Sequence, residues 1–584
     1  MKVSIAKRYL VTTALESTYP EENEKILFLG EWCKPYSKKN LWENLDSEVL
    51  DYHWDNRNKF EKDYHYLNTF YEKILKNISI KMNSLHQVNL SNRYWRILLG
   101  PWLALFIQSV FDRWEMIRLA INSNEKLQSN IISESELLWT SYDYSDFKKL
   151  AMESDGWNNF IYSKIIELHH EKIYINKIDS NNLSSRIINS NNKSLKIFFF
   201  KLYQSIVNLI NSNKSSLIIS SYLNLIDDIS LSFRLFQLPL FINVQTTKQH
   251  SPNRDQRGWE LDLETSSSFE KFIIKLIPNQ IPSIYLEGYN YLNKKVKKLN
   301  WPKSPRSIFT SNSIHEDDMF KHYAGINDNV PLVIGQHGGN YGISKLVHRE
   351  DHELSICDKY ISWGWTDSSF KSKIYPLGQL NSRSIKKSNS KKTKLLIVTC
   401  VVPRYSYLMN SISISSQWLS YFKNQIEFVK KLDESISNKT TVRLYRQDYG
   451  WGQEAMWREE LPTLNYDRGF SNIETLHNET KLYVATYNST TYLETFRLNI
   501  PTVMFWDTNH WENRDTVKPL FEELKRVKIF HDSPESASKH INEIWDDVEG
   551  WWASSEVTEV INKFNESVNR NNKNISSDLS KILK

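Results

Sequence analysis

The segment from residue 485 to residue 507 carries a cluster of small hydroxyl side chains. It reads ATYNSTTYLETFRLNIPTVMFWD, with apolar runs at both ends, which predicts a strand, a turn, a helix and a second strand. Ser489, Thr490 and Thr491 then fall at a helix N-terminus, where free N–H groups and the helix dipole favour an anion. An ordinary capped helix explains the same residue types. Thr491 and Glu494 also have capping-box spacing, which gives Glu494 a purely structural interpretation.

A glycine-rich loop in the first half of the chain is the second candidate for chemistry. The sequence GQHGGNYG at 335–342 has four glycines in eight residues, which would let backbone approach a ligand closely. His337 is the side chain in this loop that titrates near neutral pH, so it is our candidate general base. A lone histidine is more often structural, and Glu353 and Asp358 are the substitutes we favour less. The other candidates in this loop are Gly335, Gln336, Gly338, Gly339 and Asn340.

Three arginines follow predicted strands in the second half. Arg404 comes after the apolar run 394–402, and Arg443 and Arg446 flank the end of a run at 441–445. On one sheet edge with the hydroxyl cluster, they would offer bidentate donors to a phosphate. A surface ion pair is the commoner fate of an arginine. The loops contain no D-x-D spacing, so we expect protein groups to neutralise charge, and we expect no metal and no cofactor.

The elements that must position these loops are predicted from apolar periodicity. Strand-like runs alternate with helical patterns, which is typical of parallel sheets covered by helices. We therefore predict an α/β protein with two Rossmann-type domains facing across a cleft. The first would cover residues 1–382, with a helical insertion at about 50–215, and the second would cover residues 383–584. The apolar segment 97–111 is too short for a membrane span and is predicted to be a buried helix.

Composition limits the class of protein. The 584 residues are 40% hydrophobic and 13% aromatic, which is enough for globular folding in more than one domain. The chain has 74 basic and 68 acidic residues, a net charge of +6. This small excess does not indicate a nucleic-acid binder, but it tolerates an anionic ligand or an acidic membrane surface. Three cysteines far apart and the lack of a signal-peptide pattern indicate a cytoplasmic protein.

Four motifs together resemble a known family. They are RYWRILLGPWL at 93–103, IGQHGGNYG at 334–342, ISWGW at 361–365 and YNSTTYLET at 487–495. In combination they resemble transferases encoded among bacterial surface-carbohydrate genes, and the last motif resembles the donor-binding segment of GT-B glycosyltransferases. The resemblance implies that the helix N-terminus holds nucleotide phosphates and that Glu494 contacts the ribose. The Ser/Thr pair is similar to that of CMP-sugar users and teichoic-acid polymerases. The long helical part up to about residue 215 departs from a minimal GT-B pattern.

The leading hypothesis is an inverting, metal-independent glycosyltransferase. Its nucleotide-sugar donor would bind the second domain, and a glycan or lipid-linked acceptor would bind the first. We expect it in the cytoplasm, at the inner face of the cell membrane, with peripheral membrane contact permitted and no nucleic-acid partner. One alternative is a nucleotide-sugar epimerase or a polyol-phosphate polymerase on the same fold. Another is a non-catalytic scaffold of carbohydrate assembly.

Overall fold

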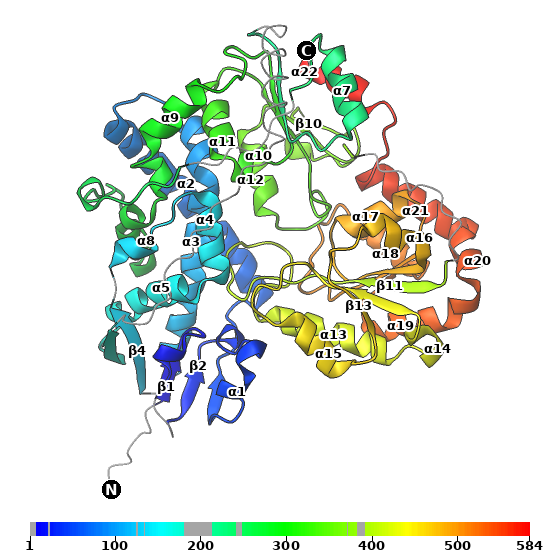
Figure 1. Cartoon of the computed structure of the whole chain (residues 1–584), viewed down its shortest axis with the longest axis horizontal. Helices are drawn as coiled ribbons and strands as arrows, with labels where there is room; N and C mark the ends of the chain where they lie inside the picture. Colours follow the sequence, from blue (N-terminus) through cyan, green and yellow to red (C-terminus); the bar gives the residue numbers. More distant parts are fainter. Residues whose placement is uncertain are drawn as a thin grey trace, which may run out of the picture.

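Three parallel β-sheets form the framework of the protein in the computed structural model (Figure 1). The α/β class is confirmed. The structure describes residues 8–20, 24–123, 126–133, 135–179, 213–240, 248–370, 372–381 and 392–584. The predicted domain boundary near residue 382 therefore lies outside the described residues.

The first sheet has the strand order β3-β2-β1-β4-β5. Its strands are short, apart from β4 and β5, and every pairing is parallel. They are β1 (Arg8–Val11), β2 (Ile26–Phe28), β3 (Ser47–Val49), β4 (Leu127–Ser133) and β5 (Ile173–Asp179). The helical pattern predicts an insertion at 50–215, but β4 and β5 lie inside it, so the N-terminal part contributes a parallel sheet of its own.

Two long helices follow β3 in the chain. They are α2 (Arg57–His86) and α3 (Asn92–Asn122). Residues 97–111 are buried within α3, as predicted, and the helix continues through Pro101. Helix α3 packs against α2 and against helices that accompany the first and the second sheets. Its length and hydropathy also suit a membrane span, but 94% of that window is buried inside the protein. The remaining helices of this part are α1 (Lys39–Trp42), α4 (Tyr144–Glu153) and α5 (Asp155–Leu168).

The second sheet has its strands in the order of the chain, β10-β9-β8-β7-β6. They are β6 (Leu217–Ile219), β7 (Ile308–Thr310), β8 (Leu332–Gly335), β9 (Lys359–Ile361) and β10 (Ile374–Tyr375). The helices of this part are α7 (Leu225–Arg234), α8 (Ser268–Gln280), α9 (Tyr289–Lys297), α10 (Ser313–Glu316), α11 (Asp318–Ile326) and α12 (His348–Ile356). The glycine-rich loop begins where β8 ends.

The third sheet has the order β13-β12-β11-β14-β15-β16. This is the Rossmann order, with its switch point between β11 and β14, where the connections leave the sheet in opposite directions and leave a crevice for ligand. The strands are β11 (Lys394–Val398), β12 (Thr440–Arg443), β13 (Asn465–Asp467), β14 (Thr480–Ala485), β15 (Thr502–Phe505) and β16 (Phe530–His531). The hydroxyl cluster follows β14 and so lies at this switch point.

Nine helices that follow β11 in the chain belong with the third sheet. They are α13 (Gln417–Lys430), α14 (Glu434–Ser437), α15 (Gln453–Glu460), α16 (Ile473–Glu479), α17 (Thr490–Arg497), α18 (Lys518–Arg526), α19 (Pro534–Ile544), α20 (Val548–Ala553) and α21 (Ser555–Val568). The last helix, α22 (Ile575–Leu583), instead packs on α7 and shares a hydrophobic core with the second sheet (Figure 1). The end of the chain therefore returns to the second sheet, which differs from the prediction that residues 383–584 form one domain.

Candidate active site

The glycine-rich loop of the second sheet touches the start of α17 in the third. The backbone N–H of Gly339 donates a hydrogen bond to Thr490 Oγ1 at 3.0 Å. A Cβ atom at Gly339 would lie 2.6 Å from the backbone N and Cα of Thr490, closer than any side chain permits. Glycine at position 339 is thus what allows the two loops to meet. The structure brings together the two candidate segments that the sequence could only name separately.

Helix α17 begins at Thr490, with Ser489 in the N-cap position. The Ser489 side chain makes no capping hydrogen bond, so the first N–H groups of the helix are not capped by this hydroxyl. Thr491 is the second helical residue and not the N-cap, so the predicted capping box with Glu494 does not form. Glu494 lies close enough to Tyr483 for its charge to contribute to raising the pKa of that phenol, which burial raises first.

The side chain of Gln336 fixes the conformation of the glycine-rich loop through hydrogen bonds. Its side-chain oxygen accepts hydrogen bonds from the Trp363 backbone N–H at 2.9 Å and from Trp365 Nε1 at 2.8 Å. Its amide nitrogen donates to the Gly338 carbonyl at 2.8 Å. Asn340 accepts at its carbonyl from the Ser344 N–H at 2.8 Å. These contacts explain the ISWGW motif, whose tryptophans fix the loop that carries His337.

His337 lies in this loop with one face toward Glu353. Its Nδ1 is 3.6 Å from Glu353 Oε1, and its Nε2 is 3.4 Å from the hydroxyl of Tyr341. Burial, with the charge of Arg349 as the second cause, lowers the pKa of His337 to about 3. The imidazole is therefore neutral at neutral pH, which is the protonation state that a general base requires, although a pKa this low makes it a weak base.

Glu353 is the centre of a buried hydrogen-bond network. Its Oε1 accepts from His315 Nε2 at 2.7 Å and from the Tyr341 hydroxyl at 3.2 Å, and its Oε2 accepts from the Tyr360 hydroxyl at 3.1 Å. Burial raises the pKa of Glu353 well above its usual range, although the two tyrosines oppose the rise. Glu353 thus orients its neighbours instead of acting as an exposed base. Sequence reasoning missed His315, which no local signal distinguishes from a structural histidine.

His315, His337 and Glu353 also form a group with the composition of a metal site. Their ligand atoms lie within 4.8 Å of one another. Ligands on a tetrahedral zinc ion, with bonds of about 2 Å, are separated by about 3.3 Å. The distance of 2.7 Å between His315 Nε2 and Glu353 Oε1 is that of a hydrogen bond. The residues as placed therefore fit a hydrogen-bonded network and would have to move apart to hold a metal.

Arg349 is the cation that sequence reasoning missed. It lies one helical turn before Glu353 on α12, and within the described ranges no carboxylate reaches ion-pair distance of it. Its Nε has no hydrogen-bond partner among the described residues. Its guanidinium lies close enough to Tyr144 to oppose the rise that burial causes in the pKa of that phenol. A largely buried and permanently charged group without an acidic partner is costly, and an anionic ligand would offset that cost.

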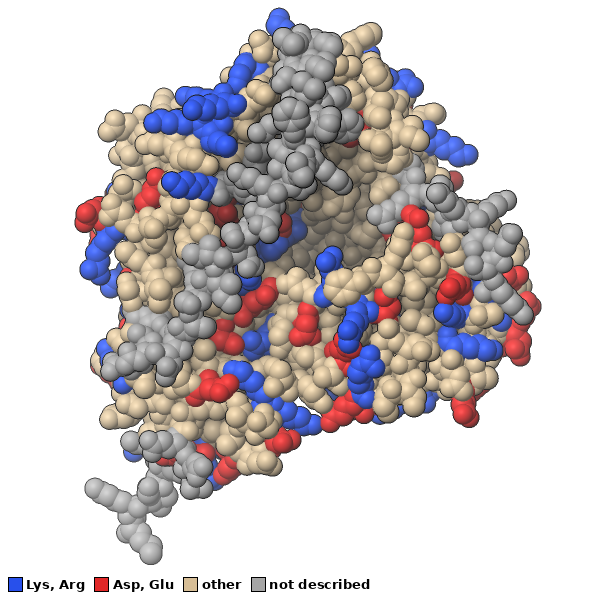
Figure 2. Space-filling view, viewed as in Figure 1, with Lys and Arg blue, Asp and Glu red and all other residues tan. Residues whose placement is uncertain are grey.

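Three tyrosines near Arg349 come from the three parts of the chain that contain the three sheets. Burial lowers the pKa of its guanidinium, but the phenols of Tyr144, Tyr407 and Tyr341, together with the more distant carboxylate of Glu316, more than compensate and raise it above its ordinary value. Tyr144 belongs to the first part of the chain, Tyr341 to the glycine-rich loop and Tyr407 to the loop after β11. Figure 2 shows a hollow in the middle of the face that it draws, with basic side chains on the floor and at the lower edge of the hollow.

The three arginines expected at a phosphate are placed differently. Arg404 is buried and pairs with Asp155 of α5 at 3.1 Å. Arg443 pairs with Asp467 at 2.6 Å. Arg446 is exposed and stacks on the ring of Phe470. Arg404 and Arg443 are thus each paired with a carboxylate.

Asp358, a less favoured candidate for the general base, is also paired with another side chain. Asp358 pairs with Arg93 at 2.7 Å and accepts a hydrogen bond from the Leu332 N–H at 2.8 Å. These contacts tie the start of β9 to α3 and to β8. We therefore leave Asp358 out of the candidate site.

Comparison with known proteins gives a family and distant structural likenesses. No curated protein matches the sequence significantly. The wall teichoic acid polymerase TagF matches at a TM-score of 0.27 and 10% identity, covering 50% of this chain and 82% of TagF. MurG of Acinetobacter baumannii matches at 0.30 and 10% identity, covering 63% of this chain and 99% of MurG. Likeness at this level says nothing about activity. The model of the LIC12162 family of transferases matches residues 8–583, so this chain belongs to that transferase family.

Proposed function

We propose that this transferase is a glycosyltransferase that moves a sugar from a nucleotide-activated donor to a glycan or lipid-linked acceptor. The observation that carries the proposal is the contact between Gly339 and Thr490. It places a loop with a neutral, proton-accepting imidazole against a helix N-terminus at the switch point of a Rossmann sheet. A proton acceptor beside an anion site is what the displacement of a nucleotide from a sugar needs.

The donor phosphates would bind at the start of α17. Ser489 and Thr490 supply hydroxyls there, Thr491 the next helical N–H group, and the helix dipole favours negative charge. Arg349 takes the role that the sequence suggests for Arg404, Arg443 and Arg446, because its charge has no carboxylate partner in the described part of the protein. In this proposal, protein groups compensate the charge of the leaving nucleotide, and the reaction is independent of metal.

The acceptor hydroxyl would be activated by His337. Nε2 of the imidazole takes the hydroxyl proton, while Nδ1 lies on the side of Glu353, 3.6 Å from its Oε1. The acceptor oxygen forms a bond to the anomeric carbon as the bond from that carbon to the phosphate oxygen breaks. The electron pair leaves with the nucleotide phosphate, and a single displacement inverts the anomeric centre. A CMP-linked donor is what the hydroxyl motif suggests, and a surface polysaccharide is the acceptor that the resemblance to surface-carbohydrate transferases suggests.

The place of action follows from the acceptor class. A nucleotide-activated donor is a cytoplasmic metabolite, and a lipid-linked acceptor would bring the enzyme to the inner face of the cell membrane. Peripheral contact with that surface would then accompany turnover, and nucleic acid has no part in this proposal.

Nucleotide binding tests the proposal against its rivals. Thermal unfolding is measured with CMP, UDP, GDP and TDP, because a ligand that binds only the folded form raises the melting temperature. Stabilisation by one of them supports an enzyme, and stabilisation by none favours a carbohydrate-assembly scaffold. Product analysis with the matching nucleotide sugar then separates the enzymes. An epimerase needs no acceptor, and a polyol-phosphate polymerase transfers a phosphodiester unit in place of a sugar.

The His337→Ala variant tests the assigned base. We expect turnover to fall by about a hundredfold or more, the usual contribution of a positioned general base, with nucleotide stabilisation retained. Wild-type turnover in this variant would remove His337 from the mechanism.

A further inference from the structure

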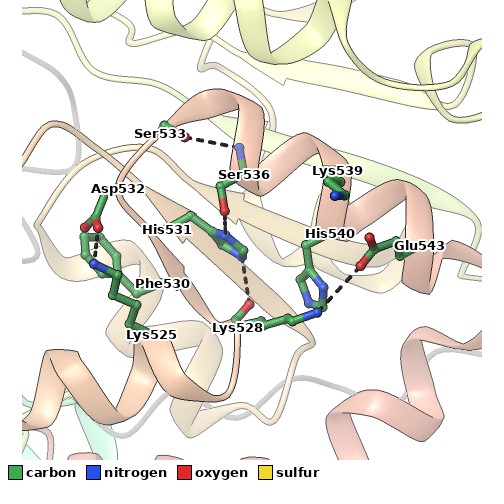
Figure 3. Close-up of a pocket in the computed structure, with 10 residues that line it drawn as sticks. All are labelled: Lys525, Lys528, Phe530, His531, Asp532, Ser533, Ser536, Lys539, His540 and Glu543. Carbon is green, nitrogen blue, oxygen red and sulfur yellow. Dashed lines mark hydrogen bonds and ion pairs between the residues drawn. The ribbon is translucent and has the colours of Figure 1, made fainter.

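A pocket of 390 Å³ lies at the outer edge of the third sheet, on the side of β16. Its lining comes from the end of α18, from β16 and from one face of α19 (Figure 3). In the sheet order, β15 separates β16 from β14, so this edge pocket is distinct from the site at the start of α17. Nothing in the proposed glycosyl transfer uses it.

His540 at the floor of the edge pocket has no hydrogen-bond partner among the described residues. The residue is only 4% exposed, and both of its ring nitrogens are buried and unpaired in that part of the chain. Its neighbour His531, in contrast, is satisfied at both nitrogens, by the Ser536 hydroxyl at 2.8 Å and by the Lys528 carbonyl at 2.9 Å (Figure 3). Leaving buried polar atoms unpaired costs about 1–3 kcal/mol, so a ligand that pairs with His540 would recover that cost.

The rim of the edge pocket is basic. Lys525 pairs with Asp532, and Lys528 lies 3.6 Å from Glu543, but the side chains of both pairs are about half exposed. Exposed pairs of this kind contribute little and exchange partners readily. Lys539 makes no ion pair with any described residue. Three lysines against two carboxylates leave the pocket with one net positive charge.

The start of α19 closes the pocket on its remaining side. The helix has 11 residues, and its N-cap Ser533 accepts a hydrogen bond from the Ser536 N–H. Its N-terminus therefore adds a favourable dipole for negative charge. Burial, together with His531 and Lys528, lowers the pKa of His540 to about 3. A neutral imidazole keeps one N–H to donate.

We propose that the edge pocket binds a phosphate group, with His540 donating from the floor and Lys539 and Lys528 contacting it from the rim. The phosphate could be free in solution or part of a phospholipid headgroup, because both present the same oxygens. A headgroup would fix the outer edge of the third sheet to a membrane surface.

Titration of the full-length protein with inorganic phosphate, against sodium chloride at matched ionic strength, tests the proposal. We expect saturable binding that His540→Phe and Lys539→Ala each weaken by about tenfold, the effect of losing one charge-assisted hydrogen bond. Lys423→Ala on α13 removes the same charge from an exposed site outside the pocket and should change nothing. Absence of phosphate binding in the wild type, or an equal loss in the Lys423→Ala variant, would overturn the proposal.

Vesicle sedimentation distinguishes the two sources of phosphate. Phosphatidylcholine vesicles with and without phosphatidylglycerol are compared, with inorganic phosphate as competitor. Binding that requires phosphatidylglycerol, is weakened by Lys539→Ala and is reversed by phosphate identifies a headgroup. Phosphate binding without vesicle binding identifies a soluble ligand. The Lys539→Ala variant changes only an exposed side chain, so it remains informative if His540→Phe does not fold.

Discussion

The backbone N–H of Gly339 and the hydroxyl of Thr490 are joined by a hydrogen bond of 3.0 Å, although 151 residues separate them in the chain. The bond connects the loop after β8 to the helix after β14. It is therefore a contact between two sheets, made at the ends of their strands. The candidate site exists only because these two loops contact each other.

Substituting Gly339 should disrupt this contact. In Gly339→Ala the new methyl would lie 2.6 Å from the Thr490 backbone, so the loop must shift, and we expect a loss of turnover of at least about tenfold, since misplacement by about 1 Å can cost a hundredfold. The measurement is kcat with the nucleotide sugar that matches the nucleotide found to stabilise the protein. Gly258→Ala is the matched control, because a methyl group at that position would have no other atom within 4 Å. Equal activity in the two variants would show that the contact is dispensable.

Removing Arg349 should separate stability from ligand binding. Arg349→Met deletes a largely buried charge that has no carboxylate partner among the described residues, so we expect the free energy of unfolding to stay within about 1 kcal/mol of wild type. Stabilisation by nucleotide should be lost. The comparison variant Arg404→Met leaves Asp155 without its arginine and should lose about 3 kcal/mol. Retained nucleotide stabilisation in Arg349→Met would exclude Arg349 from the phosphate site.

Glu353 should act through its neighbours. In Glu353→Gln the side chain keeps its shape, but an amide nitrogen replaces one of its two oxygens, so it can no longer accept from both His315 and Tyr360. We expect kcat to fall by about a hundredfold and the KM for the donor to change little. The pH profile of kcat should also shift, which a purely structural residue would not cause. Asp358→Asn is the control and should keep the wild-type profile, since Asp358 pairs with Arg93.

Acidification should destabilise the protein through its buried histidines. The pKa of His322 and that of His348 are both lowered to about 4, mainly by burial, from 6.5 in a free histidine. Below about pH 6.5 the unfolded chain binds protons that the native state refuses, so stability falls as the pH drops toward about 4. Glu350, whose pKa burial raises to about 7, has the opposite sign and offsets part of the effect.

Denaturant unfolding between about pH 7 and about pH 5 measures this dependence. The His322→Gln variant should show a shallower loss, by at most about 1.4 kcal/mol per pH unit. Stability that stays constant or rises on acidification would contradict the neutral state of these histidines.

Much of the local structure was predictable because it depends on neighbours in the chain. The apolar periodicity of residues 97–111 indicated a buried helix, and they lie inside α3. The run before Gly335 and the run before the hydroxyl cluster indicated strands, and they are β8 and β14. The prediction of a helical insertion at 50–215 missed β4 and β5. The helical patterns in this region are long and strong, whereas these two strands are flanked by weakly patterned sequence.

The sequence by itself determined the α/β class, the glycine-rich loop at a strand end and the helix that starts in the hydroxyl cluster, since each rests on local periodicity and residue type. Only the tertiary structure decided which cations remain for a ligand. Arg404 meets Asp155 across 249 residues, whereas Arg349 meets no described carboxylate, and no local pattern distinguishes the two. Charge pairing is settled by long-range packing, and so the arginine at the candidate site is not one that its sequence neighbours pointed to.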